Sequence, residues 1–262
     1  MRLNNWATDL QTFVFINLLL KYQTNIMLSP DDKILVIDIG GSHIKATLLD
    51  TGGKLLKDYE KLVTPKPATP TAVVATIMQL AKTLQGYTKA AAGFPGFVKN
   101  GIVYTAPNLD NKSWKNIDLN KVLGDSLKCP VRVLNDADMQ GLAVISGKGF
   151  EIMITLGTGF GTAFLMNGKL LPHFELAHHP ICKNQTYDDY CGQKALDRYG
   201  KKKWNRRMQK VLVILQTVFN YDRLYIGGGN AAQLTGSFAD NIKIVTNLDG
   251  IHGGIKLWND QA

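Results

Sequence analysis

The sequence predicts an α/β protein made of two similar halves that face a cleft. In residues 33–62 a buried strand meets a glycine turn and continues through two further strands joined by a second turn. Residues 151–171 repeat this order of strands and turns around another glycine-rich turn. Internal duplication of this kind is typical of related lobes, so we expect the two halves to enclose a ligand site.

The first half is expected to contain four strands and one helix. Runs of apolar and β-branched residues predict strands at residues 33–37, 44–50, 54–62 and 90–94. A helix should begin after Thr69, because threonine caps helix N-termini well and Pro70 suits the first helical position. Gly86 should end that helical run.

The rest of the chain is expected to contain five strands and three helices. Its strands are predicted at residues 131–134, 151–156, 162–166, 169–171 and 224–226, and its helices at residues 136–146, 204–219 and 253–258. The pair Asn167-Gly168 is a strong signal for a hairpin between two of these strands.

These elements predict two domains and an extension. Residues 1–30 form the N-terminal extension, whose apolar run at residues 12–20 is too short to span a bilayer, so no transmembrane segment is expected. Residues 31–133 form a small α/β domain, and residues 134–250 form a larger one. A C-terminal helix over residues 251–262 is expected to pack back on the small domain.

Composition limits the partners and the compartment. Three cysteines in 262 residues do not make a disulfide framework, which favours the cytoplasm. The net charge of +9 favours polyanionic partners. The basic run at residues 201–207 is interpreted either as a solvated helix start or as a track for a long polyanion. Without a helix-turn-helix, zinc finger or RNA-stacking motif, nucleic acid is not an expected partner.

Three glycine turns, each following a buried strand, are candidate phosphate sites. They are Gly40-Gly41, Gly157-Thr158-Gly159-Phe160-Gly161 and Gly227-Gly228-Gly229. Glycine lets the backbone approach a phosphate closely, and successive amide groups can then bind an anion. None of the three fits a P-loop or a convincing dinucleotide fingerprint, so the sequence predicts phosphate binding of another kind.

Two aspartates at strand ends are candidates for catalytic work. Asp38 lies beside the first glycine turn, where it would hold Mg²⁺ directly or through water, or would simply cap the turn. Lys45 would reach phosphate oxygens or lie on the strand surface. Asp136 begins a helix and is interpreted either as an N-cap or as a general base for an attacking hydroxyl, with Asp138 as the rival base.

Glu175 and His178 could converge on a polyhydroxylic sugar or could be ordinary loop residues. Cys182 and Cys191, together with the neighbouring histidines, lack the paired Cys-x-x-Cys spacing of a zinc knuckle, so zinc is disfavoured.

The motifs as a set resemble the ROK family of sugar kinases, and within it the polyphosphate/ATP glucokinases. They appear in family order over about residues 33–256: Ile37-Asp38-Ile-Gly40-Gly41-Ser42-His43-Ile44-Lys45, Gly93-Phe94-Pro95-Gly96, Asn135-Asp136-Ala137-Asp138, Leu156-Gly157-Thr158-Gly159-Phe160-Gly161, Glu175-Leu-Ala-His178 and Tyr225-Ile-Gly227-Gly228-Gly229. The resemblance implies the duplicated actin-like ATPase (ribonuclease H-like) fold, with two α/β domains around a cleft.

It also implies a sugar kinase that transfers phosphate from ATP or polyphosphate to the 6-hydroxyl of a hexose, with glucose expected. Asp136 would be the catalytic base, and Asp38 would serve Mg²⁺. The sugar would be bound by Asn108, Asn135, Glu175 and His178. Phosphate or nucleotide would be bound by Gly40, Gly41, Ser42, Lys45, Gly157, Thr158, Gly159, Gly227, Gly228 and Gly229, the last three near the adenosine. Relatives are usually dimers, so a homodimer is expected.

Two departures from the family pattern motivate an alternative. Ala177 replaces the glycine usual before the family histidine, and a further sugar-binding glutamate has no clear match, although Asp188 or Asp189 could substitute. The cysteine-rich zinc motif of many members is also missing, as it is in polyphosphate-using members. The alternative is a sugar-binding sensor of the same fold without catalytic activity.

Overall fold

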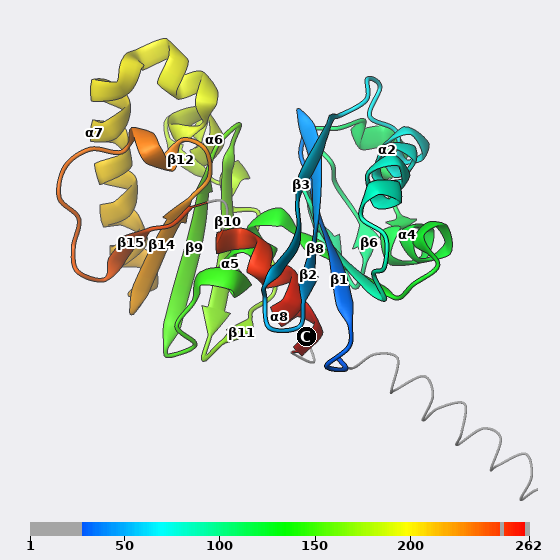
Figure 1. The fold of residues 1–262 in the computed structure, drawn as a ribbon. Coiled ribbons are helices and arrows are strands. Elements are labelled where there is room, and N and C mark those ends of the chain that lie inside the picture. Colours follow the sequence, from blue (N-terminus) through cyan, green and yellow to red (C-terminus); the bar gives the residue numbers. More distant parts are fainter. Residues whose placement is uncertain (1–27, 247–248, 260–262) are drawn as a thin grey trace, which may run out of the picture.

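The computed structural model describes residues 28–246 and 249–259, and these form two five-stranded sheets with helices between and around them (Figure 1). Residues 1–27 of the expected N-terminal extension and residues 260–262 of the expected C-terminal helix lie outside the described residues. Within the described part, no helix combines the length and apolarity needed to cross a membrane.

The first sheet has the strand order β3-β2-β1-β4-β8. Its strands are β1 (Lys33–Ile39), β2 (His43–Asp50), β3 (Leu55–Val63), β4 (Lys89–Phe94) and β8 (Val131–Asn135). Strands β1, β2 and β3 form an antiparallel meander, and β4 and β8 run parallel to β1. Strand β8 extends to Asn135, so the expected domain boundary before residue 134 falls inside a strand of this sheet.

The second sheet repeats this plan with the order β11-β10-β9-β14-β15. Its strands are β9 (Phe150–Leu156), β10 (Phe160–Met166), β11 (Lys169–Leu170), β14 (Arg223–Gly227) and β15 (Ile242–Ile244). Strands β9, β10 and β11 are antiparallel, and β14 and β15 run parallel to β9. The predicted duplicated α/β fold is therefore confirmed.

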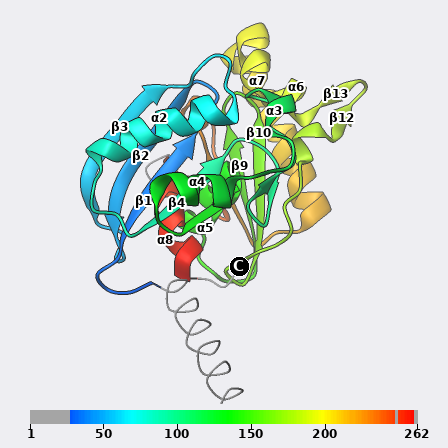
Figure 2. The same cartoon turned by 90° about the vertical axis from the view of Figure 1, so that its right-hand side faces the viewer.

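Because side chains alternate along β1, the two faces of the first sheet pack against different helices. Helices α2 (Pro70–Thr83) and α4 (Leu119–Leu127) cover one face, where they pack with Leu35 and Ile37 (Figure 2). Ile34 and Val36 point to the other face and pack with α8 (Gly253–Asn259). The four side chains from Ile34 to Ile37 are all buried, which explains why this part of β1 is a continuous apolar run.

Helix α5 (Asp136–Val144) lies between the two sheets and contacts strands of both, and α8 packs on it as well (Figure 1). The N-terminus of α5 is thus the point at which the two halves meet. The outer face of the second sheet is covered by α6 (Tyr187–Cys191) and α7 (Gln193–Phe219).

Helix α7 is longer than predicted. It begins at Gln193 rather than near Trp204, and Gly200 interrupts it with a positive φ of 71° and a non-helical ψ. The apolar pattern after Trp204 predicted only the part beyond this kink. The shorter elements are β5 (Val98–Lys99), β6 (Ile102–Val103), α3 (Asn111–Trp114), β7 (Ile117–Asp118), η1 (Leu176–His178), β12 (Pro180–Cys182), β13 (Gln185–Thr186), η2 (Ala231–Gln233) and η3 (Asp249–His252).

Candidate active site

A cavity of about 570 Å³ lies between the two sheets and collects most of the predicted site residues. Those that line it are Asp38, Gly40, Gly41, Lys45, Asn108, Asn135, Asp136, Gly157, Thr158, Gly159, Glu175, His178, Gly228 and Gly229. Ser42 and Gly227 lie outside this lining. The three glycine turns, far apart in sequence, therefore face one space.

The first glycine turn is held closed by a residue that sequence reasoning missed. The amide of Gly40 donates to the carbonyl of His43 at 3.0 Å, which closes the hairpin between β1 and β2. From the end of β3, the hydroxyl of Thr64 donates to the carbonyl of Gly40 at 2.6 Å, and its amide donates to the carbonyl of Ser42 at 3.0 Å. Thr64 is buried, so the turn is preorganised. The main-chain carbonyl of Ser42, which lies outside the cavity lining, contributes to this arrangement.

Asp38 and Lys45 form an ion pair of 3.5 Å at the cavity wall. Burial raises the pKa of the Asp38 carboxyl, and the ammonium of Lys45 opposes that rise. Across the described residues, no group of three or more His, Cys, Asp or Glu side chains gathers as a metal cage. A single carboxylate fits Mg²⁺ in the form kinases use, in which substrate phosphates and water supply the other ligands.

The second glycine turn is held by α7 and by the third turn. The amide of Gly157 donates to the carbonyl of Gly159 at 3.1 Å. The carbonyl of Gly157 accepts from the amide of Gln193 at 2.9 Å and from the side-chain amide of Asn230 at 3.2 Å. Gly228 has a φ of +85°, and a Cβ there would lie 2.3 Å from the carbonyl oxygen of Leu156. Only glycine fits this close approach of the two turns.

Asn135 is the N-cap of α5. Its side-chain oxygen accepts from the amides of Ala137 at 2.8 Å and Asp138 at 3.2 Å, and its amide nitrogen donates to the carbonyl of Gly96 at 3.1 Å. The N-cap interpretation considered for Asp136 thus applies to its neighbour. Because a primary amide carries two N–H groups, Asn135 keeps one donor for a ligand in the cavity.

Asp136, the predicted base, lies at the cavity wall. It occupies the first turn of α5 at the cavity wall, and its Oδ1 accepts from the amide of Ala137 at 2.8 Å. Burial raises the pKa of its carboxyl to about 7, and the negative charge of Asp38 is the second cause. Asp138, the rival base, is outside the cavity lining and is paired with His173 at 2.9 Å.

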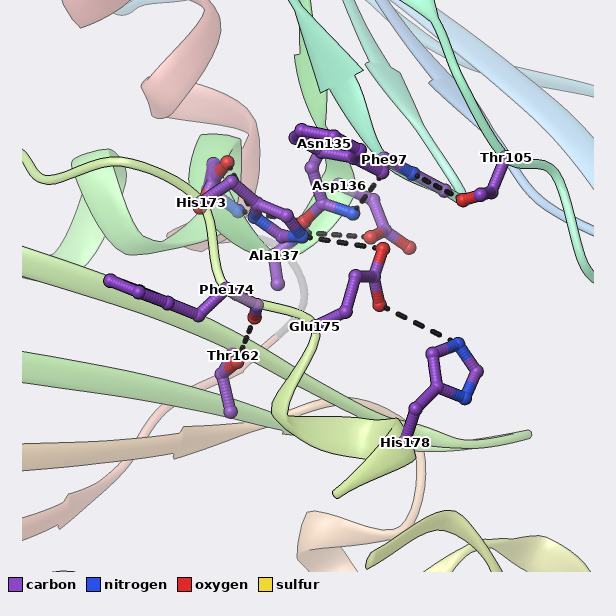
Figure 3. A network of polar contacts seen from close by, with 12 residues as sticks. Phe97, Thr105, Asn135, Asp136, Ala137, Thr162, His173, Phe174, Glu175 and His178 are labelled. Carbon is purple, nitrogen blue, oxygen red and sulfur yellow. Dashed lines mark hydrogen bonds and ion pairs between the residues drawn. The ribbon is translucent and has the colours of Figure 1, made fainter. Parts of the chain in front are cut away.

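A row of alternating acids and histidines joins α5 to the segment after β11 (Figure 3). Asp138 Oδ2 contacts Nδ1 of His173 at 2.9 Å, and Nε2 of His173 lies 3.4 Å from Oε1 of Glu175. Oε2 of Glu175 lies 3.9 Å from Nε2 of His178. Glu175 and His178 line the cavity, whereas His173 lies behind them. Sequence reasoning missed His173, for which no local pattern gave a signal.

The structure distinguishes the two acids considered as substitutes for the missing family glutamate. Asp188 lines the cavity, and its Oδ1 accepts from the amide of Phe160 at 2.6 Å. Asp189 faces away and accepts from Thr186 in a capping box at the start of α6. Asp188 is therefore the acid that a bound ligand could meet. The cavity lining also includes Tyr59, Lys61 and Gln140, which the sequence did not single out.

Known proteins match most of the chain. Residues 34–195 match the model of the ROK family. The chain is 35% identical over 203 residues to a polyphosphate glucokinase of Mycobacterium leprae, and this alignment covers 74% of the chain and 62% of that protein. It is also 35% identical over 202 residues to the polyphosphate glucokinase of Mycobacterium tuberculosis strain CDC 1551, covering 74% of the chain and 76% of that protein.

Solved structures show the same fold. An inorganic polyphosphate/ATP-glucomannokinase from Arthrobacter sp. strain KM superposes with a TM-score of 0.79 at 31% identity, covering 88% of this chain and 100% of that one. A ROK family glucokinase from Streptomyces griseus, solved in complex with glucose and AMPPNP, gives a TM-score of 0.72 at 20% identity. The match covers 86% of this chain and 98% of that one. The resemblance and the actin-like fold predicted from the motifs are thereby confirmed, and the chain belongs to the ROK family.

Proposed function

We propose that the protein is a sugar kinase that transfers a phosphoryl group from polyphosphate or ATP to the 6-hydroxyl of a hexose, with glucose as the first candidate. The observation that carries the proposal is a carboxyl with a pKa of about 7, that of Asp136, in a cavity shared by three glycine turns and by polar side chains suited to sugar hydroxyls. The names of the relatives, glucokinases and a glucomannokinase, support the same activity and substrate class.

In the proposed mechanism, Asp136 accepts the proton of the attacking sugar hydroxyl. Glu175 and His178 bind other hydroxyls, and Asn135 donates its remaining amide hydrogen. The backbone amides of the glycine turns offset the negative charge of the transferring phosphoryl group. Mg²⁺, held by Asp38 and the donor phosphates, would neutralise further charge on those phosphates.

The surface of α7 favours polyphosphate as the donor. This helix starts at the second glycine turn, where the amide of Gln193 donates to Gly157. Along it, the only acidic side chain from residue 194 to residue 210 is Asp197. The exposed basic side chains of the same stretch are Lys194, Arg198, Lys201, Lys202, Lys203, Arg206 and Lys210. A linear polyanion that leaves the cavity would be attracted along this cationic helix, whereas the triphosphate of ATP is too short to follow it.

The experiment that tests the proposal is formation of glucose 6-phosphate by the purified chain with Mg²⁺, using ATP and polyphosphate in separate reactions. Product with either donor supports the kinase and identifies that donor. If folded protein binds glucose but forms no product with either donor, the sugar-sensor alternative replaces the kinase. Mannose and glucosamine, tested in parallel, define the hexose.

Two further expectations stay predictions. Cys129, Cys182 and Cys191 are unpaired thiols, which suits a reducing cytoplasm. The expected homodimer is checked by sedimentation of the purified chain at several concentrations.

A further inference from the structure

The buried imidazole of His173 connects two functional segments. Asp138, on α5, is two residues beyond Asp136, and Glu175 belongs to the segment that precedes η1. His173 lies between them, with Nδ1 2.9 Å from Asp138 and Nε2 3.4 Å from Glu175. The histidine and Asp138 side chains are only 6% and 7% exposed, so water contributes little to their solvation.

The arrangement favours a doubly protonated ring, in which Nδ1 donates to Asp138 and Nε2 faces Glu175 as an ion pair without a well-aligned hydrogen bond. Both ring nitrogens face carboxylates, and only the imidazolium form has two N–H donors. A buried carboxylate without a cation is strongly disfavoured, and among the described residues His173 is the cationic partner of Asp138. In agreement, the hydrogen bonds and negative charges of Asp138 and Glu175 raise the pKa of His173 to about 10 although burial lowers it.

A third segment fixes the plane of the ring. The phenyl ring of Phe97 stacks on His173 with centroids 5.7 Å apart and an interplanar angle of 15°. Phe97 follows Gly96, the residue whose carbonyl accepts from Asn135. The imidazole is thus fixed by an aromatic face from the first half of the chain and by carboxylates at both nitrogens (Figure 3).

We infer that His173 is a positioning residue that, as a fixed cation between Asp138 and Glu175, orients Glu175 toward the sugar and couples it to the helix of Asp136. Its contact with Oε1 holds one oxygen of Glu175 at the back of the cavity. The other oxygen stays directed toward His178 at the cavity wall, where a sugar hydroxyl would bind. This inference rests on the proposed function, since it assigns Glu175 to a sugar.

The main test is His173→Asn, with affinities measured separately for the two substrates. Asparagine can still donate to Asp138 but carries no charge and cannot reach both acids. The expected result is a rise of about tenfold or more in the dissociation constant of glucose, comparable to losing a hydrogen bond to a charged group. The KM for the phosphate donor should stay within about twofold, because the acidic partners of His173 are Asp138 and Glu175 and neither belongs to a glycine turn. Equal losses for both substrates, or unchanged glucose affinity, would overturn the inference.

Two further variants separate positioning from stability. In Asp138→Asn/His173→Asn the buried charge mismatch at Asp138 is removed, so the fold should be restored while glucose affinity stays low. Thr162→Val is the matched control, because its hydroxyl anchors the same segment through the carbonyl of Phe174 at 3.0 Å without any charge. If Thr162→Val weakens glucose binding as much as His173→Asn does, the cation has no special role.

A readout independent of turnover keeps this inference distinct from the kinase proposal. In ¹⁵N NMR spectra at neutral pH, both ring nitrogens of His173 should be protonated, and a neutral ring would overturn the inference. If the wild-type chain binds glucose but transfers no phosphate, the kinase proposal fails while the affinity comparison still decides the role of His173. Absence of hexose binding by the folded wild type would refute both.

Discussion

At the residue scale, the carboxyl of Asp136 combines access to the cavity with a high proton affinity. An ordinary aspartate is too weak a base at neutral pH to take much of a hydroxyl proton. Burial and the charge of Asp38 raise the pKa of Asp136 to about 7, which brings its basicity close to the optimum for general-base catalysis near neutrality.

Replacing Asp136 with asparagine should therefore remove the base while keeping the shape. We expect Asp136→Asn to lower kcat by about 10²–10⁴-fold, the usual effect of a positioned base, with glucose affinity nearly unchanged. Steady-state kinetics and calorimetric glucose titration measure the two quantities. Asp58→Asn, an exposed aspartate on β3, is the matched control and should behave as wild type. Wild-type kcat in Asp136→Asn would move the catalytic role elsewhere.

The pH dependence follows from the same carboxyl. Only the deprotonated form can accept a proton, so activity should be lost as pH falls through the folded-state pKa of about 7. Below that pH, kcat/KM should drop about tenfold per pH unit. An unperturbed aspartate, with a pKa of 3.8, would instead give a flat profile down to about pH 5. A pH–rate profile of the free enzyme distinguishes these two outcomes.

Local patterns could predict single residues but not residues that meet only on folding. Asn135-Asp136 follows a strand and starts a helix, so a polar pair at that place was visible in the sequence. Thr64 and His173 have no such signature. Thr64 acts on a turn 24 residues earlier, and His173 acts on an acid 35 residues earlier. Their partners are defined by strand pairing and helix packing, which no short window contains.

At the scale of elements, the repeated glycine hairpins were predictable because their spacing and strand composition recur. The full length of α7 was not, since Gly200 breaks its helical geometry and the seven residues before the kink lack a long apolar pattern. The residues before the kink bear on the donor proposal, because they place basic side chains on the helix that starts at the second glycine turn.

The cationic face of α7 is expected to select long donors. Removing three charges together, in Lys201→Ser/Lys202→Ser/Lys203→Ser, should raise the KM for long-chain polyphosphate several-fold and leave the KM for ATP unchanged. High salt should weaken the preference of the wild type for long-chain polyphosphate, since exposed charges are screened. Steady-state kinetics with ATP, tripolyphosphate and long-chain polyphosphate, at low and at high salt, measure these KM values.

The control removes the same charge from the first sheet. Lys33→Ser/Lys54→Ser/Lys57→Ser changes exposed lysines at the start of β1 and in the β2–β3 hairpin region. It should leave all three KM values unchanged. Equal effects of the two triple variants would show that net charge, rather than α7, governs donor affinity.

At the scale of the whole molecule, the C-terminal segment returns to the first sheet and packs on the central helix. The side chains of Ile255, Leu257 and Trp258 are buried against Ile34 and Val36, at the opposite end of the described chain. The sequence predicted a closing helix but could not derive these contacts from any local pattern. Because α8 also packs on α5, it supports the helix that presents Asp136.

Trp258 should therefore contribute strongly to stability. Its ring is 4% exposed, and the guanidinium of Arg132 and the ammonium of Lys89 lie over it at 4.6 Å and 5.8 Å from the ring centroid. We expect Trp258→Ala to lower the free energy of unfolding by about 3–5 kcal/mol, because it leaves a large cavity and removes the cation–π contacts. Urea denaturation followed by circular dichroism measures the change.

Val218→Ala is the matched control, because this α7 side chain is 63% exposed and should change stability by less than about 0.5 kcal/mol. A loss below about 1 kcal/mol in Trp258→Ala would mean that α8 is only loosely attached and that α5 is held by the sheets alone. A large loss, with glucose affinity reduced in the remaining folded protein, would instead show that the packing of α8 also fixes the position of Asp136. In that case the stability of the first sheet and the geometry of the site depend on the same helix.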